Sequence, residues 1–221
     1  MLPWDAKKFW RSTRAVESAR HLSLTYARQE LGRRAAQSAQ VFTDSHDSFT
    51  HLNFFREQFP QVIADLPRGF TAIEIGAGMG WHSALVASHG GNGCTVLATE
   101  FAWAKDKRPH DEPNLHAYHR LGQRDEKLKS FLEFSRDAAG NLNGVAYRGA
   151  LGFARAGGEA LPAADGCADL VYTVNCIEHI PDLPATFAEA ARVLRIGGVF
   201  LGTTEPLYFS PFGHHLADVF P

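Results

Sequence analysis

The chain has 221 residues, of which 45% are hydrophobic and 21% are charged, and its formal net charge is −2 at pH 7. This balance indicates a globular protein with one main domain, and no stretch approaches the roughly 18 apolar residues that cross a bilayer, which excludes integral membrane contact. Residues 35–221 have no basic stripe, which excludes nucleic acid as a main partner.

The amino-terminal part differs from the rest in charge. Residues 1–34 hold eight of the 22 Lys and Arg residues and three of the 24 Asp and Glu residues. Few helix breakers occur in residues 5–40, which predicts one or two helices whose basic side chains either face solvent or form a surface for phosphate or anionic lipid. A further helix is expected from Ser48 to Phe59, with Pro60 as its stop. We therefore predict an N-terminal helical cap over residues 1–69.

The core begins with the segment AIEIGAGMG, residues 72–80. Its alternating pattern predicts a strand from Thr71 to Ile75, and the glycines allow a tight turn and the close approach of a ligand. A helix over Met79–His89 would point its free N–H groups at that turn. The loop therefore predicts a nucleotide-type pocket, with a purely structural turn as the alternative. A dinucleotide site wants glycine at the position of Trp81, which argues against a pyrophosphate.

The segment that follows begins with a regular strand and then loses regularity. A turn at Gly90–Gly93 leads into a second strand, Cys94–Thr99. Residues 101–152 are longer than a simple crossover needs, so we predict an insertion that covers the site and, with Trp103 and Tyr118, forms an acceptor lid. Within it, Asp125–Ala138 has a helical pattern and 140–144 is a turn.

The remaining pattern continues the alternation of strands and helices. Strand three is expected at Val145–Arg148 or at Phe153–Ala156, strand four at Asp169–Asn175 and strand five at Val199–Thr203. A helix over Pro184–Leu194 would end at the two glycines that follow it. The alternation predicts an α/β fold with a doubly wound, mostly parallel sheet.

Glu100 closes the second strand. A carboxylate at the carboxyl edge of a parallel sheet can accept hydrogen bonds from both hydroxyls of a ribose. A solvated acid or a helix cap is the alternative interpretation of Glu100.

Three later motifs complete a pattern. They are LPAADGCADLV at residues 161–171, NCIEHIPD at 175–182 and RVLRIGGVF at 192–200. With the glycine loop and Glu100, they resemble the class I S-adenosylmethionine-dependent methyltransferases, in particular the type 11 small-molecule branch, over about residues 70–204. The resemblance implies a Rossmann-like sheet of seven strands in the order 3-2-1-4-5-7-6.

The resemblance also implies which residues bind the cofactor S-adenosylmethionine. It places one group around the methionine portion: Glu74, Gly76, Ala77, Gly78 and Gly80. Glu100 would hold the ribose, and Asn175 would face the sulfonium and the acceptor. The family often has an acid after strand three for the adenine amino group, but this chain has Ala156-Gly157-Gly158. We therefore expect Glu159 and Ala160 to serve the adenine.

Methyl transfer to a hydroxyl needs a base, and the chain offers several histidines. The candidate catalytic residues are His179, His214 and His215, and His82 is a further candidate base. The histidines favour O-methylation of a small-molecule acceptor, although His179 could instead anchor its loop. Glu178, His179 and Asp182 loosely match a divalent-metal loop of related enzymes, but no metal site is predicted.

The carboxyl-terminal segment 205–221 is too short for the last helix and strands of the implied fold, so we expect those strands to be missing. An end within this aromatic segment is typical of a fragment or an early terminus; in a complete chain, strand five would be an exposed edge that favours a homodimer. Three cysteines without CxxC spacing, and an N-terminus without a secretory pattern, predict a cytoplasmic location.

Other functions compete with methyl transfer. One is a non-catalytic binding or interaction module derived from a methyltransferase. A second is a protein that acts through its basic helices, residues 1–34. A third, a nicotinamide-dependent oxidoreductase, is disfavoured by Trp81.

Overall fold

A computed structural model of the chain describes residues 39–101 and 112–203. One or two helices are predicted in residues 5–40, of which residues 5–38 lie outside the described residues. Trp103 of the predicted lid and the segment 205–221 also lie outside them. Residues 45–204 belong to one compact unit, and the description below concerns that unit. In the described part of the chain, no helix is long and apolar enough to cross a membrane.

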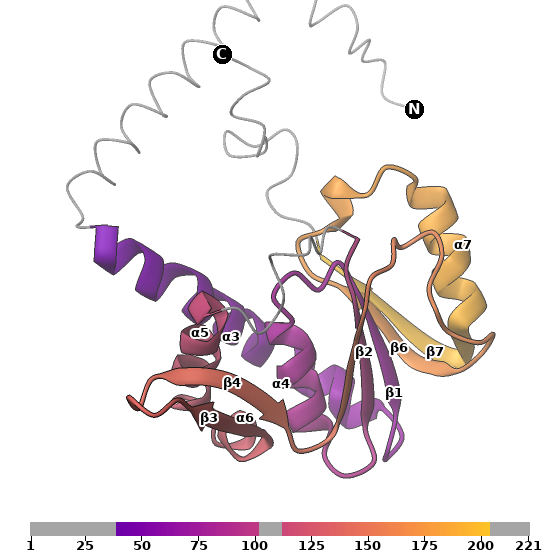
Figure 1. Ribbon diagram of the computed structural model, residues 1–221. Helices are drawn as coiled ribbons and strands as arrows, with labels where there is room; N and C mark the ends of the chain where they lie inside the picture. Colours follow the sequence, from indigo (N-terminus) through magenta and orange to yellow (C-terminus); the bar gives the residue numbers. More distant parts are fainter. Residues whose placement is uncertain (1–38, 102–111, 204–221) are drawn as a thin grey trace, which may run out of the picture. The chain divides into compact units, whose positions relative to one another are not determined.

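A parallel sheet forms the centre of this unit (Figure 1). Among the described residues it has five strands in the order β5-β2-β1-β6-β7, and every neighbouring pair is parallel. The strands are β1 (Thr71–Ile75), β2 (Thr95–Thr99), β5 (Ala150–Ala154), β6 (Ala168–Thr173) and β7 (Leu194–Gly202). The predicted α/β class is therefore confirmed, and this order equals the first five strands, 3-2-1-4-5, of the implied sheet.

Helices connect the strands. Helix α4 (Trp81–Gly90) links β1 to β2, and α7 (Leu183–Val193) links β6 to β7 after a short 3-10 turn, η1 (Ile177–His179). Between β2 and β5 lie α5 (Glu112–Gly122), α6 (Glu126–Phe131) and an antiparallel hairpin of β3 (Leu132–Arg136) and β4 (Leu142–Tyr147). The hairpin is a separate two-stranded sheet beside the central one (Figure 1).

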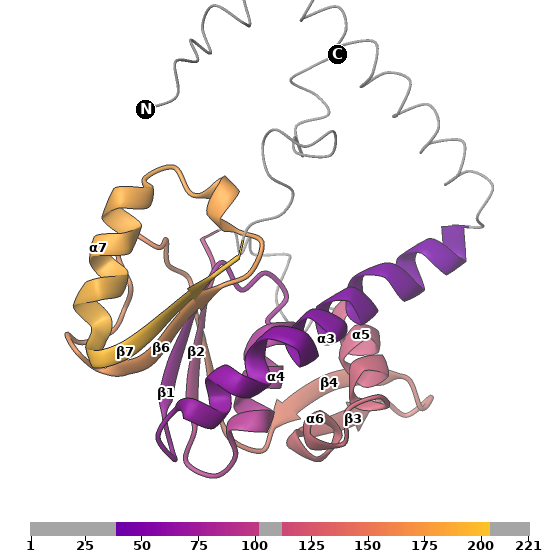
Figure 2. The same ribbon diagram turned by 180° about the vertical axis from the view of Figure 1, so that it is seen from behind.

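The two faces of the central sheet bury different residues. On β1, the side chains of Ala72 and Glu74 face α4 and the helix α3 (Ala39–Asp65), whereas Ile73 and Ile75 pack on the side of α7. Figure 2 shows α3 and α4 together on one side of the sheet and α7 on the other. Successive side chains of a strand point to opposite faces, so a sheet covered on both sides needs continuous burial along β1.

Helix α3 does not end where the sequence predicted. It runs from Ala39 to Asp65 and contains Pro60 in its interior. Proline removes one backbone hydrogen bond, but Val62 and Ile63 beyond it pack against the same apolar cluster as Phe59. The burial of these side chains outweighs the local preference, so the predicted stop at Pro60 is wrong.

The predicted helix over Asp125–Ala138 is also wrong beyond its first turns. Asp125 caps α6 by accepting a hydrogen bond from the Leu128 N–H at 2.9 Å, and the chain changes to strand at Leu132. The hairpin turn lies at Asp137, whose Oδ1 accepts from the N–H groups of Ala139 and Asn141. These bonds fix a tight turn that the helical pattern of the preceding residues conceals.

Two other boundaries differ from the expectation. The third strand of the parallel sheet is β5, which overlaps the alternative at Phe153–Ala156, whereas Val145 belongs to the hairpin. Strand β7 begins at Leu194, and its two glycines lie inside it, with Gly197 at a φ of 80° where the register with β6 shifts. From Ala168 to Leu170 the strand β6 advances two residues while its partners on β7 advance five, from Leu194 to Val199, so β7 holds three extra residues there, and glycines fit such an irregularity.

Candidate functional site

The loop between β1 and α4 is held in a conformation that favours glycine. Gly76, Gly78 and Gly80 have φ values of 72°, 51° and 77°. The Gly80 N–H donates to the Ala77 carbonyl at 2.7 Å, and the Ala77 N–H donates to the Thr99 carbonyl at 2.9 Å. The loop is therefore a tight turn fixed to the end of β2, with the amino end of α4 behind it.

Gly76 and Gly78 meet different surroundings. A β-carbon at Gly76 would lie 2.0 Å from the Cys176 sulfur, whereas one at Gly78 would meet no atom of the described residues within 4 Å. The loop is thus packed at Gly76 against the residue that begins the turn after β6, and the space beside the Gly78 α-carbon is open among the described residues. Left-handed glycines with such a space beside them form a cradle that a ligand can approach closely.

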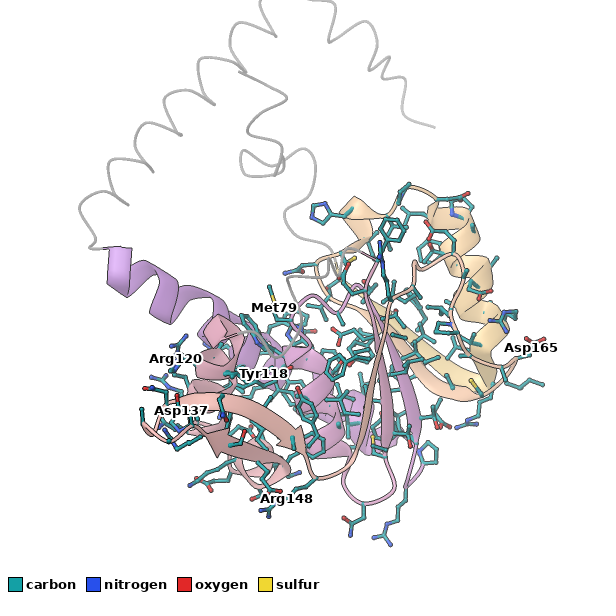
Figure 3. All side chains as sticks on the ribbon, viewed as in Figure 1. Met79, Tyr118, Arg120, Asp137, Arg148 and Asp165 are labelled. Carbon is teal, nitrogen blue, oxygen red and sulfur yellow. The ribbon has the colours of Figure 1, made fainter. Side chains whose placement is uncertain are left out.

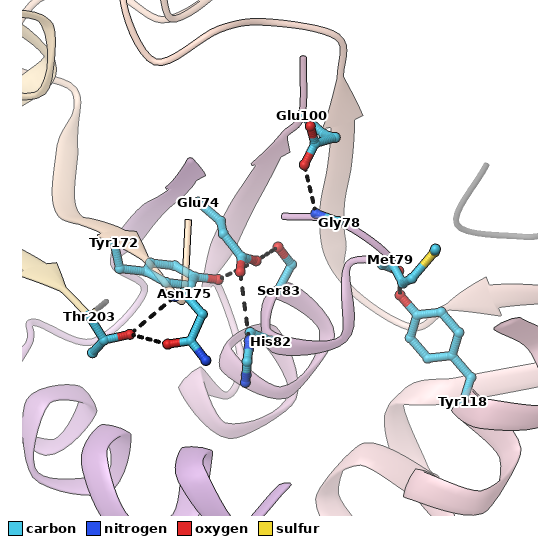
Figure 4. A network of polar contacts seen from close by, with 10 residues as sticks. All are labelled: Glu74, Gly78, Met79, His82, Ser83, Glu100, Tyr118, Tyr172, Asn175 and Thr203. Carbon is cyan, nitrogen blue, oxygen red and sulfur yellow. Dashed lines mark hydrogen bonds and ion pairs between the residues drawn. The ribbon is translucent and has the colours of Figure 1, made fainter. Parts of the chain in front are cut away.

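Glu100 lies beside this cradle (Figure 4). Its Oε2 accepts a hydrogen bond from the Gly78 N–H at 3.0 Å. Its backbone N–H donates to Ala154 at 3.2 Å, and its carbonyl accepts from the Ala156 N–H at 3.3 Å, so Glu100 is fixed between the ends of β2 and β5. The structure therefore brings the predicted ribose acid and the predicted glycine loop together.

The segment after β5 folds beside Glu100. The Ala160 N–H donates to the Gly157 carbonyl at 3.3 Å, which closes a turn. A β-carbon at Gly157 would lie 2.5 Å from a carboxylate oxygen of Glu159 and 3.7 Å from the ring of Phe101. The Glu159 carboxylate thus occupies the space where a side chain of residue 157 would begin, and Phe101, 70% exposed, lies next to it.

Asn175 follows β6 in a left-handed conformation, with a φ of 48°. Its N–H donates to the Thr203 carbonyl at 3.1 Å, and its Oδ1 accepts from the Thr203 hydroxyl at 3.3 Å. Asparagine tolerates this conformation better than most residues. Because Cys176 packs on Gly76, Asn175 lies at the same edge of the sheet as the glycine loop.

Glu74 differs from the other predicted cofactor residues because it is 1% exposed. Its carboxylate accepts hydrogen bonds from the hydroxyls of Ser83 and Tyr172, the latter at 3.2 Å, and its other oxygen lies 3.9 Å from His82 Nδ1 (Figure 4). Burial raises the pKa of Glu74 to about 8, against the opposing effect of these hydrogen bonds. The side chain thus joins β1 to α4 inside the protein.

The candidate bases have different positions. His82 is 5% exposed and packs against the rings of Phe54 and Phe59, which makes it a core residue and argues against a catalytic role. His179 is exposed at the end of η1, beyond the carboxyl end of β6. His214 and His215 lie outside the described residues.

A metal site finds no support in this part of the chain. Among the described residues, no group of three or more His, Cys, Asp or Glu side chains could hold a metal ion. Asp182, one member of the loose metal motif, accepts a hydrogen bond from the Ala185 N–H at 3.0 Å as the N-cap of α7. This capping bond explains the presence of Asp182 without a metal.

Together, the parallel strand order, the glycine loop and the acid at the end of β2 define a Rossmann-like domain of the nucleotide-binding type. Residues 128–202 match a family model described as "Methyltransferase domain".

Known proteins resemble parts of the chain. It is 38% identical over 63 residues to an uncharacterized methyltransferase of Mycobacterium sp. (strain JLS), which is 28% of this chain and 25% of the relative. It is 40% identical over 73 residues to an uncharacterized methyltransferase of Mycobacterium ulcerans (strain Agy99), which is 33% of this chain and 28% of the relative. The matches span about a quarter of the length of these curated relatives.

A solved S-adenosylmethionine-dependent methyltransferase from Mesorhizobium loti is 18% identical, with a TM-score of 0.39, over 74% of this chain and 55% of that chain. The family model and the curated relatives confirm the resemblance to methyltransferases that the motifs indicated.

Sequence reasoning missed the side chains that hold the site from behind. Ser83 and Tyr172 hold Glu74, Cys176 packs on Gly76, and Tyr118 donates to the Met79 carbonyl at 2.8 Å. Tyr118 was expected on an acceptor lid, but its side chain is fully buried. Ser83 lies two residues into α4, so an inward-facing position was readable, but nothing in the sequence joins Tyr118 to Met79.

Proposed function

We propose that this chain transfers the methyl group of S-adenosylmethionine to a small-molecule acceptor, with a hydroxyl oxygen as the favoured target. The observation that carries the proposal is the junction at the sheet edge, where the glycine loop meets the acid at the end of β2: the Gly78 N–H donates to the Glu100 carboxylate at 3.0 Å. The match of residues 128–202 to a methyltransferase family supports it.

Different residues at this edge would bind different parts of the cofactor. Glu100 would accept hydrogen bonds from the ribose hydroxyls and share its carboxylate with the Gly78 N–H. Glu159 would accept from the adenine amino group, with Phe101 against the ring, because both lie beside Gly157. The backbone from Gly76 to Gly80 would line the methionine portion. These residue types and positions fit an adenosyl ligand.

The cofactor, when bound, supplies an electrophilic methyl group on a sulfonium, which an acceptor attacks in line. The chain's contribution is to orient the two reactants, because a fixed geometry supplies on the order of 7 to 11 kcal/mol of a bimolecular barrier. Asn175 would orient the acceptor from the end of β6. His179 is exposed after the same strand and would accept the proton of an acceptor hydroxyl at a ring nitrogen.

The cofactor assignment is tested by calorimetric titration of S-adenosylmethionine and S-adenosylhomocysteine into the chain. We expect binding in the micromolar range for the parent protein, and at least about tenfold weaker binding for Glu100→Ala. Glu57→Ala is the matched control, because Glu57 is an exposed acid on α3. A folded parent protein that binds neither compound would reject the proposal, and so would equal affinities for the two variants.

The alternative is a binding module without turnover. It is favoured by Ala156-Gly157-Gly158, which stand where the family often has an acid for the adenine amino group. In that case, the chain binds the cofactor but releases no S-adenosylhomocysteine when it is incubated with a panel of phenols, carboxylic acids and amines. Product formation with any of these acceptors would exclude the alternative, and loss of that product in His179→Ala would support the proposed base.

A further inference from the structure

Tyr118 lies on α5, 39 residues along the chain from the glycine loop, and it is fully buried. Its hydroxyl donates a hydrogen bond to the Met79 carbonyl at 2.8 Å. Figure 3 shows the two residues beside each other, where α5 approaches the start of α4. Burial raises the pKa of Tyr118 well above its ordinary value, so the hydroxyl keeps the proton that it donates.

The contact continues at the next residue of the loop. A β-carbon at Gly80 would lie 2.6 Å from the ring of Phe153 and 3.0 Å from the Tyr118 hydroxyl. Gly80 is therefore enclosed by one side chain from α5 and one from β5. The end of the loop that leads into α4 is packed, whereas Gly78 is open.

An aromatic cluster extends this contact into the hairpin. The Tyr147 ring on β4 lies 6.1 Å from that of Tyr118, 5.8 Å from that of Phe153 and 5.8 Å from that of Phe131. Edge-to-face and tilted aromatic pairs at these distances are favourable. The segment from α5 to β4 is thus joined to the glycine loop through a rigid group of rings.

Two side chains therefore hold the loop from different directions. Glu100 accepts from the Gly78 N–H, and Tyr118 donates to the Met79 carbonyl, one residue further on. The two bonds differ in what a ligand does to them. A ribose that engages the Glu100 carboxylate competes with the Gly78 N–H, whereas the buried Tyr118 bond is out of its reach.

We propose that Tyr118 is a positioning residue, which keeps the glycine loop in its ligand-binding conformation while Glu100 engages the ribose. This inference rests on the proposed function for the identity of the ligand. It assigns to the segment between β2 and β5 a role in holding the cofactor loop, in addition to any contact with the acceptor. The Tyr118 bond lowers the entropic cost of binding because the loop is ordered in advance.

The test compares two variants of the full chain that each lose one hydroxyl donor to a backbone carbonyl. Tyr118→Phe keeps the ring and removes the donor to Met79. The control, Ser88→Ala, removes the hydroxyl that donates to the Leu85 carbonyl at 2.9 Å within α4. Titration with S-adenosylhomocysteine measures affinity, and hydrogen exchange of peptides that cover residues 76–81 measures the order of the loop without ligand.

We expect Tyr118→Phe to weaken binding by about three- to tenfold, which corresponds to one hydrogen bond, and to speed exchange at the loop. Ser88→Ala is expected to stay within about twofold of the parent chain in affinity, even where both variants lose the same thermal stability. Equal affinities and equal loop exchange in the two variants would overturn the role of Tyr118.

Failure of the proposed function gives a different result. If the parent chain binds no S-adenosylhomocysteine, the cofactor assignment is rejected. The exchange comparison still decides whether Tyr118 orders the loop, because it needs no ligand: faster exchange in Tyr118→Phe alone supports the inference, and unchanged exchange rejects it.

Discussion

The unit formed by β1, the glycine loop and α4 contrasts with the segment from α5 to β4. In the first, each feature follows from neighbouring residues: alternation gives the strand, and the glycines give the turn that enters the helix. In the second, α6 and the hairpin depend on distant partners, such as His89 on α4 and Phe153 on β5. The contrast shows that neighbouring residues determine the conformation of the glycine loop, whereas side chains distant in the sequence stabilise it.

The largest effect is expected from placing a β-carbon at Gly76. Gly76→Ala would bring that carbon to 2.0 Å from the Cys176 sulfur, at a φ of 72° that alanine disfavours. Overpacking and backbone strain together are expected to lower the free energy of unfolding by about 3 to 5 kcal/mol. Urea unfolding measures the loss.

Gly78→Ala is the matched control, because Gly78 has a φ of 51° but no atom of the described part of the chain lies within 4 Å of the added carbon. Its strain alone is expected to lower the free energy of unfolding by about 1 to 2 kcal/mol. A loss in Gly76→Ala no larger than that in Gly78→Ala would show that the packing of β6 on the loop is not tight. Partial recovery in Gly76→Ala with Cys176→Ala would show that it is.

The second prediction concerns the contact between α6 and α4, whose residues are distant in the sequence. Asp125 is 6% exposed, caps α6, and its two carboxylate oxygens each lie 3.0 Å from His89 Nε2 on α4. Asp125→Ala removes the cap and leaves a half-buried imidazole without this partner, so we expect a loss of about 2 to 3 kcal/mol in urea unfolding at pH 7. Asp125→Asn keeps the cap, so its loss should be smaller; equal losses would mean that His89 contributes nothing.

The Asp125 carboxylate also gives this prediction a pH dependence. The pKa of Asp125 is lowered, because its hydrogen bonds to His89 and to the Leu128 N–H outweigh the opposing effect of burial. A lowered folded pKa stabilises the protein above the unfolded value of about 3.9, and the contribution disappears as the pH falls through the folded pKa. The difference in the free energy of unfolding between the parent chain and Asp125→Asn should therefore become smaller at acidic pH.

The third prediction concerns Glu74, which lies inside the locally encoded unit. Its pKa rises from 4.5 to about 8 on folding, so between these values the folded protein binds the proton more tightly than the unfolded chain does. Stability therefore decreases as the pH rises through this window, by at most about 1.4 kcal/mol per pH unit. Glu74→Gln lacks this dependence and still accepts from Ser83 and Tyr172.

Urea unfolding at pH 5.5 and pH 8 measures the effect at Glu74. We expect Glu74→Gln to gain stability relative to the parent chain at the higher pH. A constant difference between the two proteins would mean that Glu74 is ionised in the folded state throughout the range, and that the network around it holds a carboxylate.

The contrast between the two regions also explains which sequence predictions succeeded. The strand at Thr71–Ile75 is confirmed residue for residue, because burial on both faces makes its pattern continuous. The stop at Pro60 is wrong because apolar residues beyond it reach the core, and the helix at Asp125–Ala138 is wrong because the Asp137 turn decides the hairpin. Proximity of Glu100 to Gly78 was predictable from strand order, whereas contacts of Tyr118 and Cys176 depend on how distant segments pack.

The smallest expected effect concerns Glu159, which is proposed to contact the ligand and not to hold the glycine loop. Glu159 is exposed, and its carboxylate lies beside Gly157, where a side chain would otherwise begin. If it accepts a hydrogen bond from the adenine amino group, Glu159→Ala should weaken S-adenosylhomocysteine binding by about three- to tenfold. It should leave the affinity for S-inosylhomocysteine, which has an oxygen in place of that amino group, nearly unchanged. Calorimetry with both ligands measures this difference in affinity. An equal loss of affinity for both ligands would mean that Glu159 does not bind the adenine amino group, and that the backbone of the 157–160 turn recognises the base instead.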